Sequence, residues 1–276
     1  MTTAVLAATP HAPVRPARPG VTFPRVLSAE WIKFRTVRST LWTLPITAVA
    51  MVGLAVLQAW GMTTIDENLP FSAAEIVTGG WFFAQLSVAV LAILSISGEY
   101  STGMIRSSFT SVPRRLPVLA AKAIVVFVAV AVVSLVAVAL AWLVALPFLD
   151  QLGLTVDLGD TDTVRVLLGA PLYLGTIGLF AFAVGALVRH SAGALAAVLG
   201  MLLVVENVFA ALPFRFFELV SPFLPSTAGT RLLTEDATAM ATAGPHLTPW
   251  QGYGVLVIWV AVLLTAAAVL MRRRDA

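Results

Sequence analysis

Glu206 and Asn207 are an acid and an amide that lie together inside a long apolar run. The run covers residues 192–212, and the pair lies about two thirds of the way along it. An ionisable group in hydrocarbon is strongly unfavourable, so it usually faces the protein interior or water. Glu206 could therefore serve a cavity or a proton-linked or substrate-linked site, or it could lock helices together as a protonated or hydrogen-bonded group.

A second polar stretch, SGEYSTGMIRSSFTSVPRRLPVLAAK, occupies residues 97–122. Four of its residues are spaced by 3, 4 and 3: Thr102, Ile105, Phe109 and Val112. This spacing predicts one apolar face of a helix of about three turns, with Arg106 turned away from it. A loop that only fixes orientation needs its basic residues and no such helix. The pattern therefore indicates a surface on which a partner docks, and a solvated loop is the alternative.

Residues 25–40, RVLSAEWIKFRTVRST, precede the first long apolar run. An apolar stripe at i, i+4 and i+7 is formed by Leu27, Trp31 and Phe34. We expect an interfacial helix that begins at Ser28 and pairs Glu30 with Lys33. A basic flank that merely fixes orientation is the alternative. The residues assigned to this helix are Glu30, Trp31, Lys33, Phe34, Arg35 and Arg38.

Motifs for catalysis are missing from the sequence. It has no GxxxxGK[ST] phosphate loop for ATP, no HExxH or other metal-spaced cluster, and no cysteine. The three histidines, His11, His190 and His246, lie in the tail or in loops, so an intramembrane protease is poorly supported. We therefore expect no enzymatic activity, no metal and no cofactor in this chain.

Membrane helices must position these polar residues. The chain is 59% hydrophobic and 11% charged, whereas soluble domains contain about 25% charged residues. A helix needs about 20 largely apolar residues to cross a bilayer. Six stretches meet this requirement: 41–60, 77–97, 123–149, 166–188, 192–212 and 252–271. The sequence thus predicts an all-α membrane protein.

The basic residues indicate how the spans are oriented. Six lie before residue 41, four in the 98–122 loop, one at Arg189 and three after the last span, so 14 of the 17 fall on one side. Basic loops stay cytoplasmic, which places both termini inside the cell. We expect a multi-pass protein of a bacterial plasma membrane.

Two further segments complete the organisation. Residues 1–24, rich in Ala and Pro, are expected to form a disordered cytoplasmic tail, followed by a single six-span membrane domain over 25–276. The aromatic, proline-broken stretch LPFRFFELVSPFLPS, residues 212–226, is too short to span and is expected to be re-entrant or interfacial on the outer side.

Taken together, these features resemble the permease subunits of type-2 ATP-binding-cassette exporters, especially actinobacterial ones. The resemblance covers nearly the whole chain and is carried by AEWIKFRTVRSTLWTL, by SGEYSTGMIRSSFTSVPRRLPVLAAKA and by six spans with both ends inside. In that family a glutamate followed four residues later by glycine opens the second-to-third loop, as Glu99 and Gly103 do here. The N-terminal tail is a departure from the family pattern.

The resemblance implies a mechanism and partners. The 25–40 helix would be a membrane-surface connecting helix, and the 98–118 loop a coupling helix that inserts into a separate ATPase, which binds ATP and Mg²⁺. A second permease chain, identical or homologous, would complete the pathway within the lipid bilayer, and nucleic acid would play no part. The residues to which it assigns coupling are Glu99, Gly103, Ile105, Arg106, Phe109, Arg114 and Arg115. Glu99 could instead pair with an arginine of the connecting helix.

Two other classes of function stay open at this stage. The first is a gradient-driven secondary transporter or channel that uses Glu206, and the second is a membrane scaffold without transport. Walls of Ala, Val, Leu and Gly favour a hydrophobic or amphiphilic cargo such as a drug, antibiotic or lipid, but lipid-facing helices share that composition.

Overall fold

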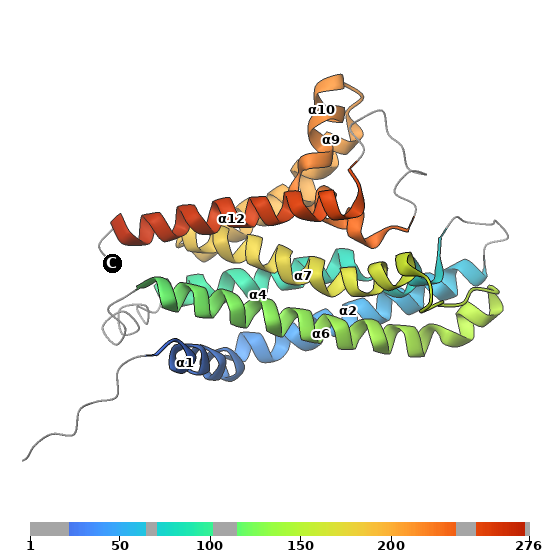
Figure 1. Cartoon of the computed structure of the whole chain (residues 1–276), viewed down its shortest axis with the longest axis horizontal. Helices are drawn as coiled ribbons and strands as arrows, with labels where there is room; N and C mark the ends of the chain where they lie inside the picture. The colour runs from blue at the N-terminus through green and yellow to red at the C-terminus, as the bar shows by residue number, and fades with distance from the viewer. Residues whose placement is uncertain (1–21, 65–70, 102–114, 236–246, 274–276) are drawn as a thin grey trace, which may run out of the picture.

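The computed structural model describes residues 22–64, 71–101, 115–235 and 247–273. Within these ranges the chain is helical and has no strand, and six of its helices are long and apolar enough to cross a membrane (Figure 1). The spanning elements are α2 (Arg38–Thr63), α3 (Ala73–Thr78) with α4 (Trp81–Ser101), α6 (Arg115–Gln151), α7 (Thr161–Val188), α8 (Ser191–Leu199) with η1 (Gly200–Val205) and α9 (Glu206–Ala211), and α12 (Pro249–Arg273). The expected all-α membrane fold with six spans is confirmed.

The helix before the first span is α1 (Phe23–Thr36). It begins five residues earlier than expected, because Pro24 occupies the first turn, where its missing N–H and fixed φ favour a helix start. Ser28 is therefore no N-cap: its hydroxyl donates to the Pro24 carbonyl within the helix. Val37 is extended and separates α1 from α2, so Arg38 belongs to the first span and not to the interfacial helix.

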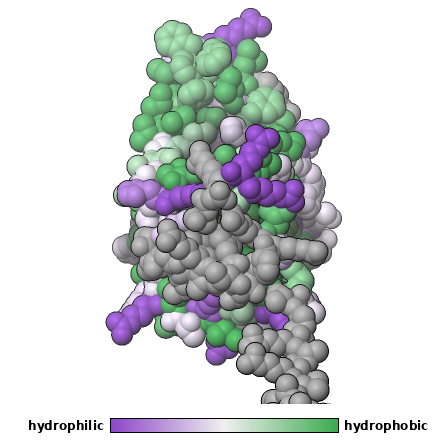
Figure 2. Space-filling model, turned by 90° about the vertical axis from the view of Figure 1, so that its left-hand side faces the viewer, coloured by the Kyte–Doolittle hydropathy of each residue, from purple (hydrophilic) through white to green (hydrophobic). Residues whose placement is uncertain are grey.

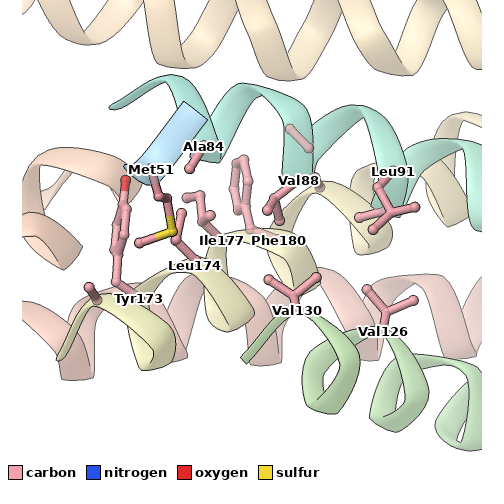
Figure 3. Packing of buried hydrophobic residues seen from close by; sticks show 14 of the residues in the cluster. Met51, Ala84, Val88, Leu91, Val126, Val130, Tyr173, Leu174, Ile177 and Phe180 are labelled. Atoms are coloured by element: carbon pink, nitrogen blue, oxygen red, sulfur yellow. The ribbon is translucent and has the colours of Figure 1, made fainter. Parts of the chain in front are cut away.

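Helix α7 forms the centre of the bundle. About 72% of its most apolar window is buried, against 22% for α2 and α12. Its Tyr173, Leu174, Ile177 and Phe180 pack against Val88 of α4 and other apolar side chains of α2 and α6 (Figure 3). This core rigidly joins the helices whose ends carry the polar residues.

Small residues allow α7 to approach its neighbours closely. A Cβ added at Gly175 would lie 2.8 Å from the Phe127 ring, and one at Gly185 would lie 2.9 Å from Ile96. Gly200 on the fifth span has no such neighbour, because an added Cβ there would meet nothing within 4 Å.

The two ends of the bundle differ in what they contain (Figure 1). One end, called here the α1 end, holds α1, the end of α4, the start of α6 and the last residues of α12. Here α7 stops at Arg189, which adopts a left-handed conformation with φ 59°, and the chain turns back into α8. The opposite end holds α3. This helix begins with a capping box, in which Ser72 and Glu75 each accept a hydrogen bond from the other's backbone N–H.

The segment expected to be re-entrant is folded into short helices. They are α10 (Arg215–Val220), η2 (Ser221–Phe223), α11 (Pro225–Gly229) and η3 (Thr230–Leu233). Helices α9 and α10 project away from the other helices (Figure 1), and α10 buries no residue. In contrast, α11 is largely buried and packs against α12. The coupling helix expected over 102–112 lies outside the described residues.

Candidate functional site

Four charged side chains meet at the α1 end and form what we call the charge network: Glu30, Lys33, Glu99 and Lys122. Lys122 Nζ lies 2.8 Å from Glu30 Oε2 and 2.8 Å from Glu99 Oε1. Lys33 Nζ lies 2.8 Å from Glu30 Oε1 and 3.6 Å from Glu99 Oε1. Acids and ammonium groups thus alternate around a ring, with each lysine between both carboxylates.

The network is buried and electrically balanced. Glu30, Glu99 and Lys122 are 4%, 8% and 6% exposed, and only Lys33 reaches the surface. Removing a charge from water is strongly unfavourable unless an opposite charge and hydrogen bonds replace the solvent. Two carboxylates and two ammonium groups provide that compensation only while all four side chains of the ring are in place.

The electrostatic effect is visible in the two members on α1. Burial by itself would raise the pKa of Glu30, but the adjacent Lys122 and Lys33 outweigh it and hold that pKa below its ordinary value of 4.5. Burial would likewise lower the pKa of Lys33, but hydrogen bonding and attraction to Glu30 and Glu99 raise it above 10.5. Both groups are therefore charged at neutral pH.

The charge network joins three helices, α1, α4 and α6, and two of them flank residues 102–114. Glu30 and Lys33 lie on α1, Glu99 lies near the end of α4, and Lys122 lies near the start of α6. Residues 102–114 connect α4 to α6, so Glu99 and Lys122 flank this segment in the sequence. A displacement of either flank would have to move α1 as well or break a buried ion pair.

The end of α4 is also fixed to the turn between α7 and α8. Ser191 Oγ donates to Ser97 Oγ at 2.9 Å, and the Arg189 guanidinium lies 5.2 Å from the centre of the Tyr100 ring. A guanidinium at this distance is attracted by the aromatic face. The charge network and this contact together connect the α1 end to the central helix.

The other predicted site residues belong to the interfacial helix and to the coupling segment. On α1, Phe34 is buried, whereas Trp31 and Arg35 are exposed, and the rings of Trp31 and Phe34 stack with centres 6.4 Å apart. Arg38, at the start of α2, is also exposed. Gly103, Ile105, Arg106, Phe109 and Arg114 lie outside the described residues, and of Arg115 only the backbone at the start of α6 is described. Glu99 pairs with Lys33 and Lys122, whereas one of the two alternatives expected for it was a pairing with an arginine of the connecting helix.

Glu206 belongs to a separate, buried polar network where the fifth span meets α11. Its carboxylate accepts hydrogen bonds from the Ser226 N–H at 2.8 Å, the Thr227 N–H at 2.7 Å and the Thr227 hydroxyl at 2.9 Å. The Ser226 hydroxyl in turn lies 2.8 Å from the Tyr173 hydroxyl. Glu206 therefore fastens the fifth span to the first residues of α11, whose N–H groups have no partner within their helix.

Asn207 does not join Glu206. It is exposed and donates to the Leu203 carbonyl of its own helix at 2.9 Å. The six residues before Glu206 form η1, a π-helix, which changes the register of the fifth span at this point. Such wide turns often occur beside functional residues, and here η1 directly precedes the carboxylate that holds α11.

Sequence reasoning missed Lys122 as a member of the site. It was counted only among the basic residues of the 98–122 loop, although it stands in the run LAAKAIVV, where a lysine needs an acidic partner. That context was a usable signal. Ser226 and Thr227 gave none, because a backbone N–H that serves as a partner leaves no trace in the residue type.

These features define a class of protein: a multi-pass membrane protein whose helix before the first span is fixed to the end of the second span and to the start of the third. Residues 26–204 match the family described as ABC-2 family transporter protein. The match covers more than half of the chain, and the chain belongs to this family. A search of curated proteins found no match. The whole charge network lies within the matched residues, whereas Glu206 and α10 to α12 lie beyond them.

Proposed function

We propose that this chain is the permease subunit of an ATP-driven exporter that moves an amphiphilic substrate out of a bacterial cell. Family membership makes it a membrane subunit of an ABC transporter, a kind of subunit that works with an ATP-binding-cassette partner. The direction of transport, the substrate and the way the ATPase is coupled are our proposals. So are a second permease chain, a single permease domain over 25–276 and a tail over 1–24.

The observation that carries the proposal is the charge network. It attaches α1 to both flanks of residues 102–114, the segment that the family resemblance assigns to ATPase contact. In this proposal Gly103, Ile105, Arg106, Phe109, Arg114 and Arg115 meet the ATPase, which holds ATP and Mg²⁺. When the ATPase pair closes, force on this segment moves α4, α6 and α1 as one unit, because separating them would expose unpaired buried charges.

The α1 end is the cytoplasmic end in this proposal. The basic residues described in the pre-helix, at the start of α6, in the α7–α8 turn and at the end of α12 all lie at that end. An excess of Lys and Arg in short loops keeps them on the cytoplasmic side of the membrane. Both termini are then inside the cell, and α3, α10 and α11 face outward.

The geometry of Glu206 favours ATP coupling over a gradient-driven carrier. A carboxylate that carries protons or ions must be able to release its partners during the cycle. Both oxygens of Glu206 instead accept N–H groups of the chain segment that begins α11. Protonation would weaken these bonds and loosen α11, which supports a structural role for Glu206.

The test is reconstitution of the full chain in proteoliposomes with a candidate phosphate-loop ATPase from the same genome. We expect the two to copurify, and we expect ATP hydrolysis to rise with a transported amphiphile. Glu99→Gln should retain assembly but lose most of the stimulated hydrolysis, whereas Asp150→Asn, at the opposite end, should leave it unchanged. Arg106→Ala tests the segment itself in the same assay.

Each alternative gives a different result in that experiment. Transport that an uncoupler abolishes and that continues without the ATPase would identify a secondary carrier. An assembled complex whose ATP hydrolysis ignores every substrate would identify a scaffold. Normal stimulated transport by the Glu99→Gln complex would remove the charge network from the coupling mechanism.

A further inference from the structure

A cavity of about 800 Å³ lies at the end of the bundle opposite α1. One wall comes from the end of α2, from α3 and from the start of α4, and the other from α9, α10, α11 and η3. Cavities of roughly 300–1,000 Å³ suit drug-sized ligands. The charge network and Glu206 do not line it.

The walls of the cavity combine aromatic rings with hydroxyl groups. Phe71, Trp81, Phe82 and Phe209 supply the rings, and Thr78 and Thr230 are among the polar residues between them. Trp81 and Phe82 contact each other edge to face, with ring centres 5.7 Å apart. Aromatic faces bind both apolar groups and organic cations.

The charged residues of the wall are Glu75, Glu218 and Arg231, two carboxylates and one guanidinium. Both carboxylate oxygens of Glu75 already accept backbone hydrogen bonds: Oε2 accepts the Ser72 N–H at 3.1 Å and Oε1 accepts the Glu235 N–H at 3.0 Å. Glu218 is only partly buried, and within the described part of the chain its carboxylate has no hydrogen bond or ion pair. Glu218 is thus the wall carboxylate that is available to a ligand.

We propose that this cavity binds amphiphilic organic cations, with Glu218 as the counter-charge and the aromatic rings around the apolar body. The claim that the cavity holds the transported substrate rests on the proposed function. Binding of a cation to the cavity can be measured without ATP or the ATPase, so the binding proposal and the proposed function can fail separately.

The test uses two probes of nearly the same shape and opposite charge, tetraphenylphosphonium and tetraphenylborate. Binding of each is measured to the full chain in nanodiscs, with empty nanodiscs of the same lipid as the blank. We expect saturable binding of the phosphonium cation above the blank. Glu218→Gln should weaken this binding on the order of tenfold, because a partly desolvated charge pair is lost. Glu218→Gln should not weaken the binding of the borate anion.

Two further variants sharpen the test. Glu218→Lys should reverse the preference, so that the borate anion binds better than the phosphonium cation. Asp150→Asn removes the same charge at the same end but does not line the cavity, and it should bind like the wild type. The proposal is overturned if the wild type shows no saturable phosphonium binding, or if Glu218→Gln binds the cation unchanged. ATP-driven transport in the reconstituted complex is scored independently of these outcomes.

Discussion

At the residue scale, Lys122 holds two buried carboxylates that belong to different helices. Glu30 comes from α1 and Glu99 from α4, and each lies 2.8 Å from the ammonium group. Lys33 also contacts both acids, but it is partly exposed and its distance to Glu99 is longer. Lys122 is therefore the member on which the ring depends most.

Lys122→Met should destabilise the protein by about 3–5 kcal/mol, the usual effect of leaving buried charges uncompensated. Unfolding in mixed micelles measures the change in free energy. Adding Glu99→Gln should recover much of the loss, because Glu30 and Lys33 then form a balanced pair. Arg35→Met, on the exposed side of α1, should change stability by at most about 0.5 kcal/mol. Strictly additive losses in the double variant would contradict the ring.

The attachment of α1 should depend on pH at both extremes. The pKa of Glu30 is depressed, so its contribution is present above the ordinary value of 4.5 and is lost as the pH falls through the folded-state value. The pKa of Lys33 is raised, so its contribution is complete below 10.5 and is lost as the pH rises through the folded-state value. Between these limits, the attachment should be constant.

A spin label at Ala29→Cys, an exposed position on α1, measures this attachment. We expect low label mobility between pH 4.5 and pH 10.5, with mobility increasing only as the pH falls further below 4.5 or rises further above 10.5. In a Glu30→Gln, Lys33→Met double variant, the mobility of the same label should no longer change at either the acidic or the alkaline limit. A transition near neutral pH would contradict the assignment of these two groups.

At the element scale, the crossing of α2 and α4 requires a glycine. A Cβ added at Gly80, just before α4, would lie 2.8 Å from the Met51 carbonyl carbon, and this is backbone that cannot rotate away. Gly80→Ala should therefore destabilise the protein by up to about 3 kcal/mol. Gly53→Ala, on α2 with nothing within 4 Å, should be neutral or stabilise the helix by about 1 kcal/mol.

The free energies of unfolding of the two alanine variants give a direct comparison. Both changes add one methyl group to a glycine near the same crossing, so helix propensity alone would shift them in the same direction. Opposite signs would show that packing against Met51 decides the effect at Gly80. Equal stability of the two variants would contradict the close approach.

Elements were more predictable from the sequence than the contacts between them. Six spans followed from run length and hydropathy, because a bilayer imposes both requirements on every spanning helix. The start of α1 was missed although Pro24 was a usable signal. The pairing of Glu30 with Lys122 spans more than ninety residues of sequence. Periodicity describes one helix at a time, so it cannot reveal which charged side chains tertiary packing will bring together.

At the scale of the whole molecule, the two ends of the bundle have different tasks. The α1 end holds the charge network that we connect with the ATPase. The opposite end holds the cavity that we connect with a cationic ligand. Apolar side chains are exposed on the projecting part of the chain, among them Phe214, Phe216 and Leu219, and the upper part of Figure 2 shows hydrophobic surface there. Such a surface suits lipid or the second permease chain that we propose.

This division of tasks depends on the orientation of the chain in the membrane. The protein contains no cysteine, so a single introduced cysteine reports one position. Asp157→Cys lies between α6 and α7 at the end opposite α1, and Arg273→Cys lies at the end of α12, both at exposed positions. In intact cells, an impermeant maleimide should label the first and not the second. Permeabilised cells should show both labelled. The reverse pattern would place the charge network outside the cell, where no ATPase could reach it, and would overturn the proposed mechanism together with the orientation.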